Sequence, residues 1–251
     1  MFRRLLNQWQ GTLLSLVGII ATVWLGITGQ LGLYIHPRYF VFTIIMAVIA
    51  AFLVVVAFAV VPRPSDEEAL LDTGAPRGRW LWSAGSVVII VAAVVGLLVL
   101  PPSTLSSATV KQRDLNGSAS TLTQAEASGL IGGDYAAFTV RDWSSLLRQG
   151  AGEDFFADKT ATVTGFVTPD KSDPENVFFV ARFFVSCCAV DAQPIGIPVY
   201  RPGWQDEFTT DSWVTITSGF ATNPSAVSDE QIVLVPDVIT PTERPAEPYV
   251  Y

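Results

Sequence analysis

Three long apolar runs without a charged residue constrain the fold most strongly. They comprise residues 11–35, 39–61 and 80–100, and they are 25, 23 and 21 residues long. A hydrocarbon core of about 30 Å is crossed by about 20 helical residues. The runs therefore predict a region of three transmembrane helices at residues 1–100, embedded in the lipid bilayer.

The first run has one competing interpretation, a secretory signal peptide, because Arg3 and Arg4 form a positive segment ahead of it. The apolar segment of a signal peptide is typically about 7 to 15 residues long and is followed by a small-x-small cleavage site. This run is longer, and no such cleavage site follows it. We therefore expect a retained helix.

The basic residues predict the orientation in the membrane. Arg3 and Arg4 precede the first run and three arginines follow the second, whereas Arg38 alone lies in the loop between the first two runs. Positively charged loops stay in the cytoplasm. We therefore expect a multi-pass protein of the cell membrane, with a cytoplasmic N-terminus and an extracytoplasmic region after residue 100.

The predicted helices carry features of helix association rather than of a transport route. Small residues at Gly18, Thr22, Gly26 and Gly29 fall on one face of the first run, and such faces let helices approach closely in lipid. This face could pack within the three-helix region or against a separate membrane protein. No carboxylate or lysine lies inside the runs, although transport routes usually contain ionisable groups. A role in transport would therefore be that of a subunit.

The region after residue 100 is strongly acidic, with nine basic and 19 acidic residues and a net charge of −10. Nucleic acid and anionic lipid head groups are repelled by such a surface. We therefore expect no nucleic-acid partner.

This region divides into a stalk and a folded domain. Residues 101–130 are rich in Ser, Thr, Ala and Gly without a hydrophobic period, which predicts a flexible stalk. Within residues 131–251, a short helix is expected in Phe138–Arg148 with Asp142 as its N-cap. Five strand-like runs separated by turn residues follow it, at residues 160–167, 176–190, 195–200, 213–220 and 231–239. The pattern predicts a small closed β-barrel of five strands with one short helix, and an extended tail at residues 241–251.

The chain has two cysteines, Cys187 and Cys188, which are adjacent in the longest predicted strand. Side chains alternate across a strand, and the odd positions here are entirely apolar. The alternation predicts that Cys187 faces the barrel core and Cys188 faces outward. A bulge at the pair would break this assignment.

Three interpretations of the cysteines remain open. They could be small buried hydrophobic residues, or they could form a disulfide, although neighbours on a regular strand point apart. They could also serve soft-metal or redox chemistry, with Asp191 as an additional oxygen ligand. Two thiolates and one carboxylate are an incomplete site for a divalent metal such as zinc, because structural zinc takes four ligands.

His36, the single histidine, is the remaining candidate ligand, and the predicted topology puts it on the same side of the membrane as the cysteines. It is either an interfacial residue beside Pro37 or a group that binds a proton or a metal. One histidine at the membrane leaves no Ser-His-Asp or Cys-His arrangement in the exported domain, and no phosphate-binding or dinucleotide motif occurs. We therefore expect no enzyme.

Four segments resemble the bacterial YcgQ-like permease-subunit family. They are Tyr34-Ile-His-Pro-Arg38, the run from Thr162 to Val167, the segment Cys187-Cys-x-x-Asp-Ala-x-Pro194, and Pro248-Tyr-Val-Tyr251. The resemblance implies membrane proteins encoded beside a multi-span permease, with an OB-like C-terminal barrel and an association with metal homeostasis.

Two functions follow as hypotheses. The first is an accessory subunit of a multi-span membrane permease, whose extracytoplasmic barrel is linked to metal-ion transport or homeostasis. The second is a membrane-anchored extracytoplasmic thiol protein that handles a metal ion or redox equivalents.

Overall fold

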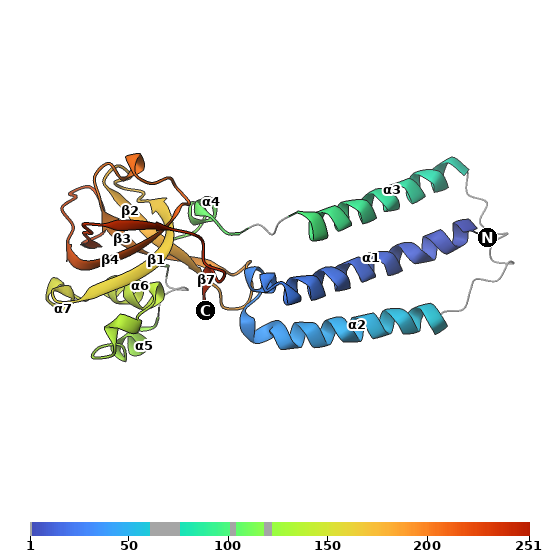
Figure 1. Cartoon of the computed structure of the whole chain (residues 1–251), viewed down its shortest axis with the longest axis horizontal. Coiled ribbons are helices and arrows are strands. Elements are labelled where there is room, and N and C mark those ends of the chain that lie inside the picture. Colours follow the sequence, from blue (N-terminus) through green and yellow to red (C-terminus); the bar gives the residue numbers. More distant parts are fainter. Residues whose placement is uncertain (1, 61–75, 101–103, 118–121) are drawn as a thin grey trace. The chain divides into compact units, whose positions relative to one another are not determined.

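The computed structural model describes residues 2–60, 76–100, 104–117 and 122–251. The chain forms two compact units, residues 1–103 and 104–251. The first is helical and the second is built around a β-barrel (Figure 1). Each unit is described separately below.

The first unit contains three long helices and shorter helical turns. The long helices are α1 (Phe2–Ile27), α2 (Phe40–Val60) and α3 (Pro76–Val94). The turns are η1 (Gln30–Leu33), η2 (Pro37–Tyr39) and η3 (Val95–Val99). Helix α1 packs against both α2 and α3. At Gly26 the approach is close, because an added Cβ atom would lie 3.0 Å from Cδ1 of Ile44.

Within the described residues, one helical segment is long and apolar enough to cross a membrane. It is Pro37–Ala57, with a mean hydropathy of 3.1 and few of its residues buried. The apolar helices at Gly11–Ile27 and Ala84–Val99 are shorter. A single such helix weakly suggests a membrane anchor, and the three-span, multi-pass topology stays a prediction.

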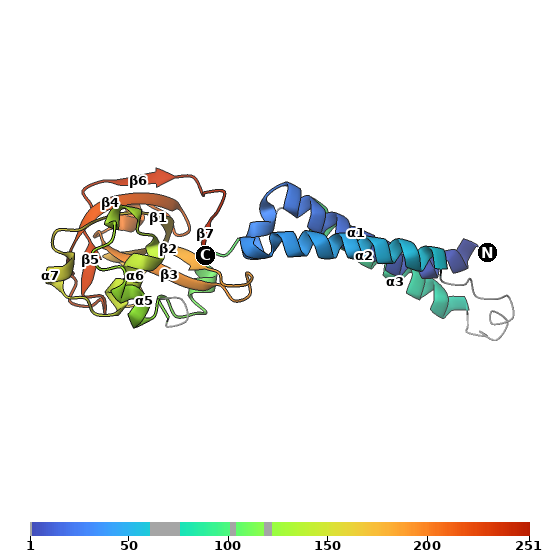
Figure 2. The same ribbon diagram turned by 90° about the horizontal axis from the view of Figure 1, so that it is seen from below.

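The second unit is a closed barrel of five strands. They are β1 (Thr160–Pro169), β2 (Val177–Phe184), β3 (Gln193–Tyr200), β4 (Trp213–Thr222) and β5 (Ile232–Leu234). Their order is β1-β2-β3-β5-β4, and pairing of β4 with β1 closes the barrel (Figure 2). The β3–β5 pair is parallel and the other barrel pairs are antiparallel. The expectation of a small closed five-strand barrel is confirmed.

Two short strands extend this sheet. Strand β6 (Ile239–Thr242) pairs with β4, and strand β7 (Tyr249–Val250) pairs with β2 in parallel. The C-terminal tail is therefore held alongside the end of β2.

The barrel core follows from alternation of branched apolar residues along the strands. Val163, Ile195, Ile197, Val214 and Ile216 are almost completely buried. Branched side chains of this kind pack well on a pleated, buried surface.

Six short helical elements lie outside the strands. They are α4 (Ser107–Val110), α5 (Gln124–Ser128), η4 (Tyr135–Ala137), α6 (Val140–Arg148), α7 (Glu153–Phe156) and η5 (Trp204–Asp206). The fully buried Trp143 of α6 packs against Phe156 of α7 and Phe220 of β4. This contact fixes α6 on the barrel.

The start of α6 differs from the expectation that Asp142 is its N-cap. Thr139 is the N-cap, and Asp142 lies three residues further along. The backbone N–H of Asp142 donates to Oγ1 of Thr139 at 3.3 Å, and the backbone N–H of Thr139 donates to Oδ2 of Asp142 at 2.8 Å. This reciprocal pair is a capping box, in which an acidic residue at the third helical position supports an upstream cap.

Residues 101–130 are expected from the sequence to form a flexible stalk, but their described part instead packs in the barrel unit. Residues 101–103 and 118–121 lie outside the described residues. The backbone N–H and the hydroxyl of Ser107 donate to the carboxylate of Asp211 at 2.7 and 2.8 Å. Asn116 bonds to the backbone of β3, and Ala127 belongs to the core. These contacts are made by single polar or small side chains. Because such residues produce no hydrophobic period, the sequence pattern does not predict that this segment packs on the barrel.

Candidate functional site

The two cysteines lie in a loop between β2 and β3, which we call the cysteine loop (residues 185–192). The strand expected over residues 176–190 ends at Phe184, and a turn follows in which the backbone N–H of Asp191 donates to the carbonyl of Cys188 at 3.0 Å. The loop begins and ends with the buried residues Val185 and Ala192. The residues between them project from the end of the barrel strands.

The expected division of the cysteines into one core residue and one outer residue is wrong. Cys187 is exposed and Cys188 is half-buried, and both are free thiols. Strand alternation does not apply to them because the chain has already left the strand at Phe184. Cys187 is therefore not a buried hydrophobic residue, and no disulfide joins the pair.

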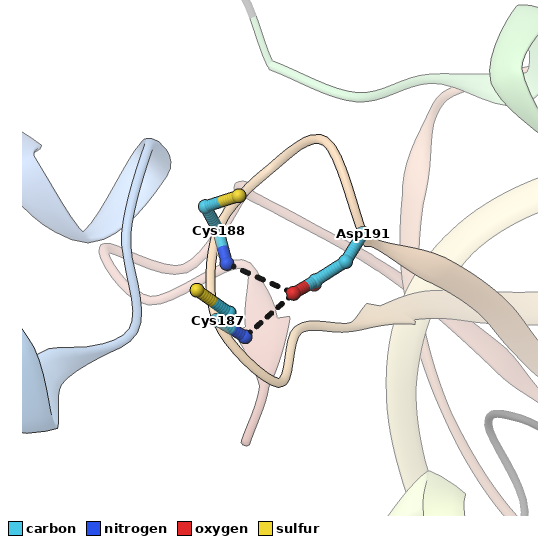
Figure 3. Close-up of side chains that lie close together, drawn as sticks. All are labelled: Cys187, Cys188 and Asp191. Carbon is cyan, nitrogen blue, oxygen red and sulfur yellow. Dashed lines mark hydrogen bonds between the residues drawn. The ribbon is translucent and has the colours of Figure 1, made fainter.

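The Asp191 carboxylate organises the loop. It accepts hydrogen bonds from three consecutive backbone N–H groups, those of Ser186 at 3.2 Å, Cys187 at 2.7 Å and Cys188 at 3.1 Å. The hydroxyl of Ser186 donates to the same carboxylate at 3.1 Å. Figure 3 shows the carboxylate facing the two cysteine nitrogens. An aspartate whose side chain bonds to nearby backbone N–H groups stabilises a tight turn.

The loop brings three of the four predicted ligands together. A ligand atom from each of Cys187, Cys188 and Asp191 lies within 4.8 Å of the other two. Within the part of the chain that the structure describes, this is the one such group of three or more acidic, thiol or imidazole side chains. Thiolates select soft metal ions, so the chemistry of the donors suits a soft cation.

The fourth predicted ligand, His36, lies in the helical unit. It is the N-cap of η2, where its Nδ1 atom accepts a hydrogen bond from the backbone N–H of Arg38 at 3.1 Å. A neutral imidazole that accepts at Nδ1 carries its proton at Nε2. The observed interaction of His36 is therefore the capping of a helical turn.

The electrostatic surroundings of the loop disfavour the charged thiolate in the absence of a cation. Desolvation raises the pKa of the Cys187 thiol, and the neighbouring Cys188 and Asp191 raise it further. Reactive catalytic cysteines have the opposite property, a lowered pKa produced by nearby positive charge. A bound cation would reverse this effect by stabilising the thiolate.

Segments far apart in the sequence hold both arms of the loop. The backbone N–H of Val185 donates to the carbonyl of Val250 in β7 at 2.9 Å. On the other arm, Nη2 of Arg113 donates to the carbonyl of Val190 at 3.0 Å. Sequence reasoning missed Arg113 and the role of Ser186, since neither belongs to a local motif.

The fold and the site define a class of protein: a helical unit joined to a closed β-barrel that displays two adjacent thiols on an organised loop. The chain belongs to the DUF1980 family. Residues 12–116 match the DUF1980 N-terminal domain, and residues 143–251, which contain the cysteine loop, match the DUF1980 C-terminal domain. Neither the curated proteins nor the solved structures contain a match to the chain.

Proposed function

We propose that this chain is a membrane-anchored protein whose extracytoplasmic barrel binds a metal ion through the adjacent thiols of Cys187 and Cys188. The observation that carries the proposal is the exposed cysteine loop, in which Asp191 accepts four hydrogen bonds, two from Ser186 and one from the backbone N–H of each cysteine. Preorganised ligands bind a metal more tightly, because less conformational entropy is lost on binding.

Metal binding is favoured over redox cycling of the same thiols. The geometry is that of a shared ligand set, because a ligand atom from each of Cys187, Cys188 and Asp191 lies within 4.8 Å of the other two. A metal ion supplies the positive charge that the loop lacks. We assign the chain no enzymatic reaction.

We further propose that the protein acts as an accessory subunit of a multi-span permease, in the manner of the YcgQ-like proteins that it resembles. The observation in favour is the surface of the helical unit: large apolar residues of α2 are exposed, among them Val41, Phe42 and Phe52. A groove between α1 and α2 is lined partly by the small residues Gly18 and Ala47. Three spanning helices with a cytoplasmic N-terminus would place the barrel outside the cell. The strand order with its closing β1–β4 pair supports an OB-like barrel.

Elemental analysis tests the metal proposal. The full chain and a variant with both Cys187→Ser and Cys188→Ser are purified in mild detergent without chelators. We expect bound metal in the native chain and its loss from the double variant. Equal metal content in the two proteins, or none in either after incubation with Zn(II) and with Cu(I), contradicts the proposal.

Co-purification tests the subunit proposal independently. A tagged copy solubilised in mild detergent from its own host should bring a multi-span membrane protein with it. A matched variant carries Gly18→Leu, which fills the groove between α1 and α2 but leaves the barrel unchanged. Loss of the partner in this variant supports docking through the helices. A native chain that purifies without any multi-span protein contradicts the proposal.

A further inference from the structure

The hydrogen bonding of Asp191 distinguishes two roles that this residue could have in the metal site. A carboxylate has about four lone-pair positions. Oδ2 accepts three hydrogen bonds, from the hydroxyl of Ser186 and the backbone N–H groups of Cys187 and Cys188, and Oδ1 accepts one, from the backbone N–H of Ser186. Metal coordination through Oδ2 would compete with the interactions that form the turn. Soft cations prefer thiolate sulfur to carboxylate oxygen, so we assign Asp191 the role of a positioning residue and the sulfur atoms the role of ligands.

The sulfur atoms take no part in the hydrogen bonds that hold the turn. Figure 3 shows the backbone nitrogens of Cys187 and Cys188 bonded to the carboxylate of Asp191, and no such bond to either sulfur atom. The two sulfur atoms are no more than 4.8 Å apart. Two metal–sulfur bonds of about 2.3 Å each span about 4.6 Å. One metal ion between the sulfurs therefore fits with little movement of the backbone.

A pair of thiolates suits only some metal ions. Structural zinc takes four ligands, and calcium and magnesium prefer six or more oxygen ligands. Among the described residues of the barrel unit, no further cysteine or acidic side chain joins the group. Soft thiolates select Cu(I), and a monovalent ion of this kind is satisfied by two sulfur ligands.

We infer that the cysteine loop is a two-coordinate site for a soft monovalent cation, Cu(I), bound by Sγ of Cys187 and Sγ of Cys188 with Asp191 outside the coordination shell. The inference rests on the proposed metal-binding function and specifies its ligand. Binding releases the two thiol protons to solvent and forms two copper–sulfur bonds, without a change in the oxidation state of either partner. The bound unit, two thiolates and one monovalent cation, carries a net charge of −1.

One basic side chain contacts the loop. The guanidinium of Arg113 donates through Nη2 to the carbonyl of Val190, inside the same loop. Its Nη1 atom is buried and has no hydrogen-bond partner among the described residues. Because its bond is to the backbone of Val190, Arg113 holds the second arm of the loop in place.

The test uses the reduced full chain in mild detergent, titrated anaerobically with Cu(I) against a chromophoric Cu(I) chelator and separately with Zn(II). X-ray absorption spectroscopy then counts the neighbours of the bound copper. We expect one Cu(I) per chain, two sulfur neighbours and no oxygen neighbour. Asp191→Asn should weaken Cu(I) affinity by about tenfold while leaving two sulfur neighbours, as expected for a residue that orients the ligands. Asp237→Asn, at an exposed site outside the loop, is the matched control and should bind as the native chain does.

The remaining outcomes separate this inference from the proposed function. Binding of Zn(II) but not Cu(I) through the cysteines overturns the inference and leaves the proposed function intact. An oxygen neighbour of copper that disappears in Asp191→Asn also overturns it, because Asp191 is then a ligand. Failure of both ions to bind overturns the inference and the proposed function together. The copper spectrum of the native chain decides the role of Asp191 even if the variant does not fold.

Discussion

Replacing Asn116 by alanine should destabilise the barrel strongly. The Asn116 side chain is only 8% exposed and bonds to the backbone of β3. Its Nδ2 donates to the carbonyl of Gly196 at 2.8 Å, and its Oδ1 accepts from the backbone N–H of Gly196 at 2.8 Å. Truncation leaves both backbone groups without these partners, and each buried unsatisfied group costs about 1–3 kcal/mol. Asn116 also has a φ angle of 55°, in a left-handed region that adds about 1 kcal/mol of strain for alanine.

Together these effects predict a loss of about 3 kcal/mol or more in the free energy of unfolding of the barrel. Pulse proteolysis across a urea series measures it on the full chain in mild detergent. Asn116→Gly is the matched control, since it removes the same hydrogen bonds without the steric strain. We expect it to be destabilised by at least about 2 kcal/mol. A native-like Asn116→Gly chain would refute the hydrogen-bond argument, and two native-like variants would refute the account of this segment entirely.

Two further predictions concern the barrel. Gly165→Ala should destabilise it by about 3 kcal/mol, because the new Cβ atom would lie 2.5 Å from the carbonyl oxygen of Ala181. In the control variant Gly219→Ala the nearest contact of the new Cβ atom would be 3.8 Å, so the free energy of unfolding should change by less than about 0.5 kcal/mol. Equal urea midpoints for the two variants would contradict this prediction. Glu230→Gln should stabilise the chain at pH 7. Desolvation and then Asp170 raise the pKa of Glu230 in the folded state, so the folded chain is most stable with Glu230 protonated and loses that stability as the pH rises through the raised pKa. Glutamine stays neutral at every pH and avoids this loss. Below pH 4.5, the ordinary value for Glu, the stability difference should vanish, and urea midpoints that differ equally at both pH values would contradict the assignment.

Regular apolar patterns in the sequence predict the barrel correctly. The alternating branched residues of β1 and β4, together with the turn residues between strands, are enough to predict a five-strand barrel. The helical face of Trp143 and Leu146 likewise located α6, both residues being buried. These elements are predictable because their burial repeats along the chain with a fixed period.

The residue types of the candidate site are predictable from the sequence, but the turn that exposes the two thiols is not. The residue types of Cys187, Cys188 and Asp191 indicated a metal-type cluster, and the structure does bring them together. The turn that exposes the thiols depends on a carboxylate bonding to backbone N–H groups three to five residues earlier, which hydrophobic alternation cannot reveal. The contacts of Arg113 and Asn116 join segments that are 77 and 80 residues apart in the sequence, so no local sequence pattern predicts these contacts.

The central claim, that both thiols of the cysteine loop bind one metal ion, is tested most directly by counting alkylated thiols. The reduced full chain is treated with a maleimide under anaerobic conditions, with and without one equivalent of Cu(I) or Zn(II), and analysed by mass spectrometry. The account predicts that Cys187 and Cys188 are both modified in the metal-free chain and both protected by at least one of the two metals. Full modification of both cysteines in the presence of Cu(I) and also in the presence of Zn(II) would contradict it.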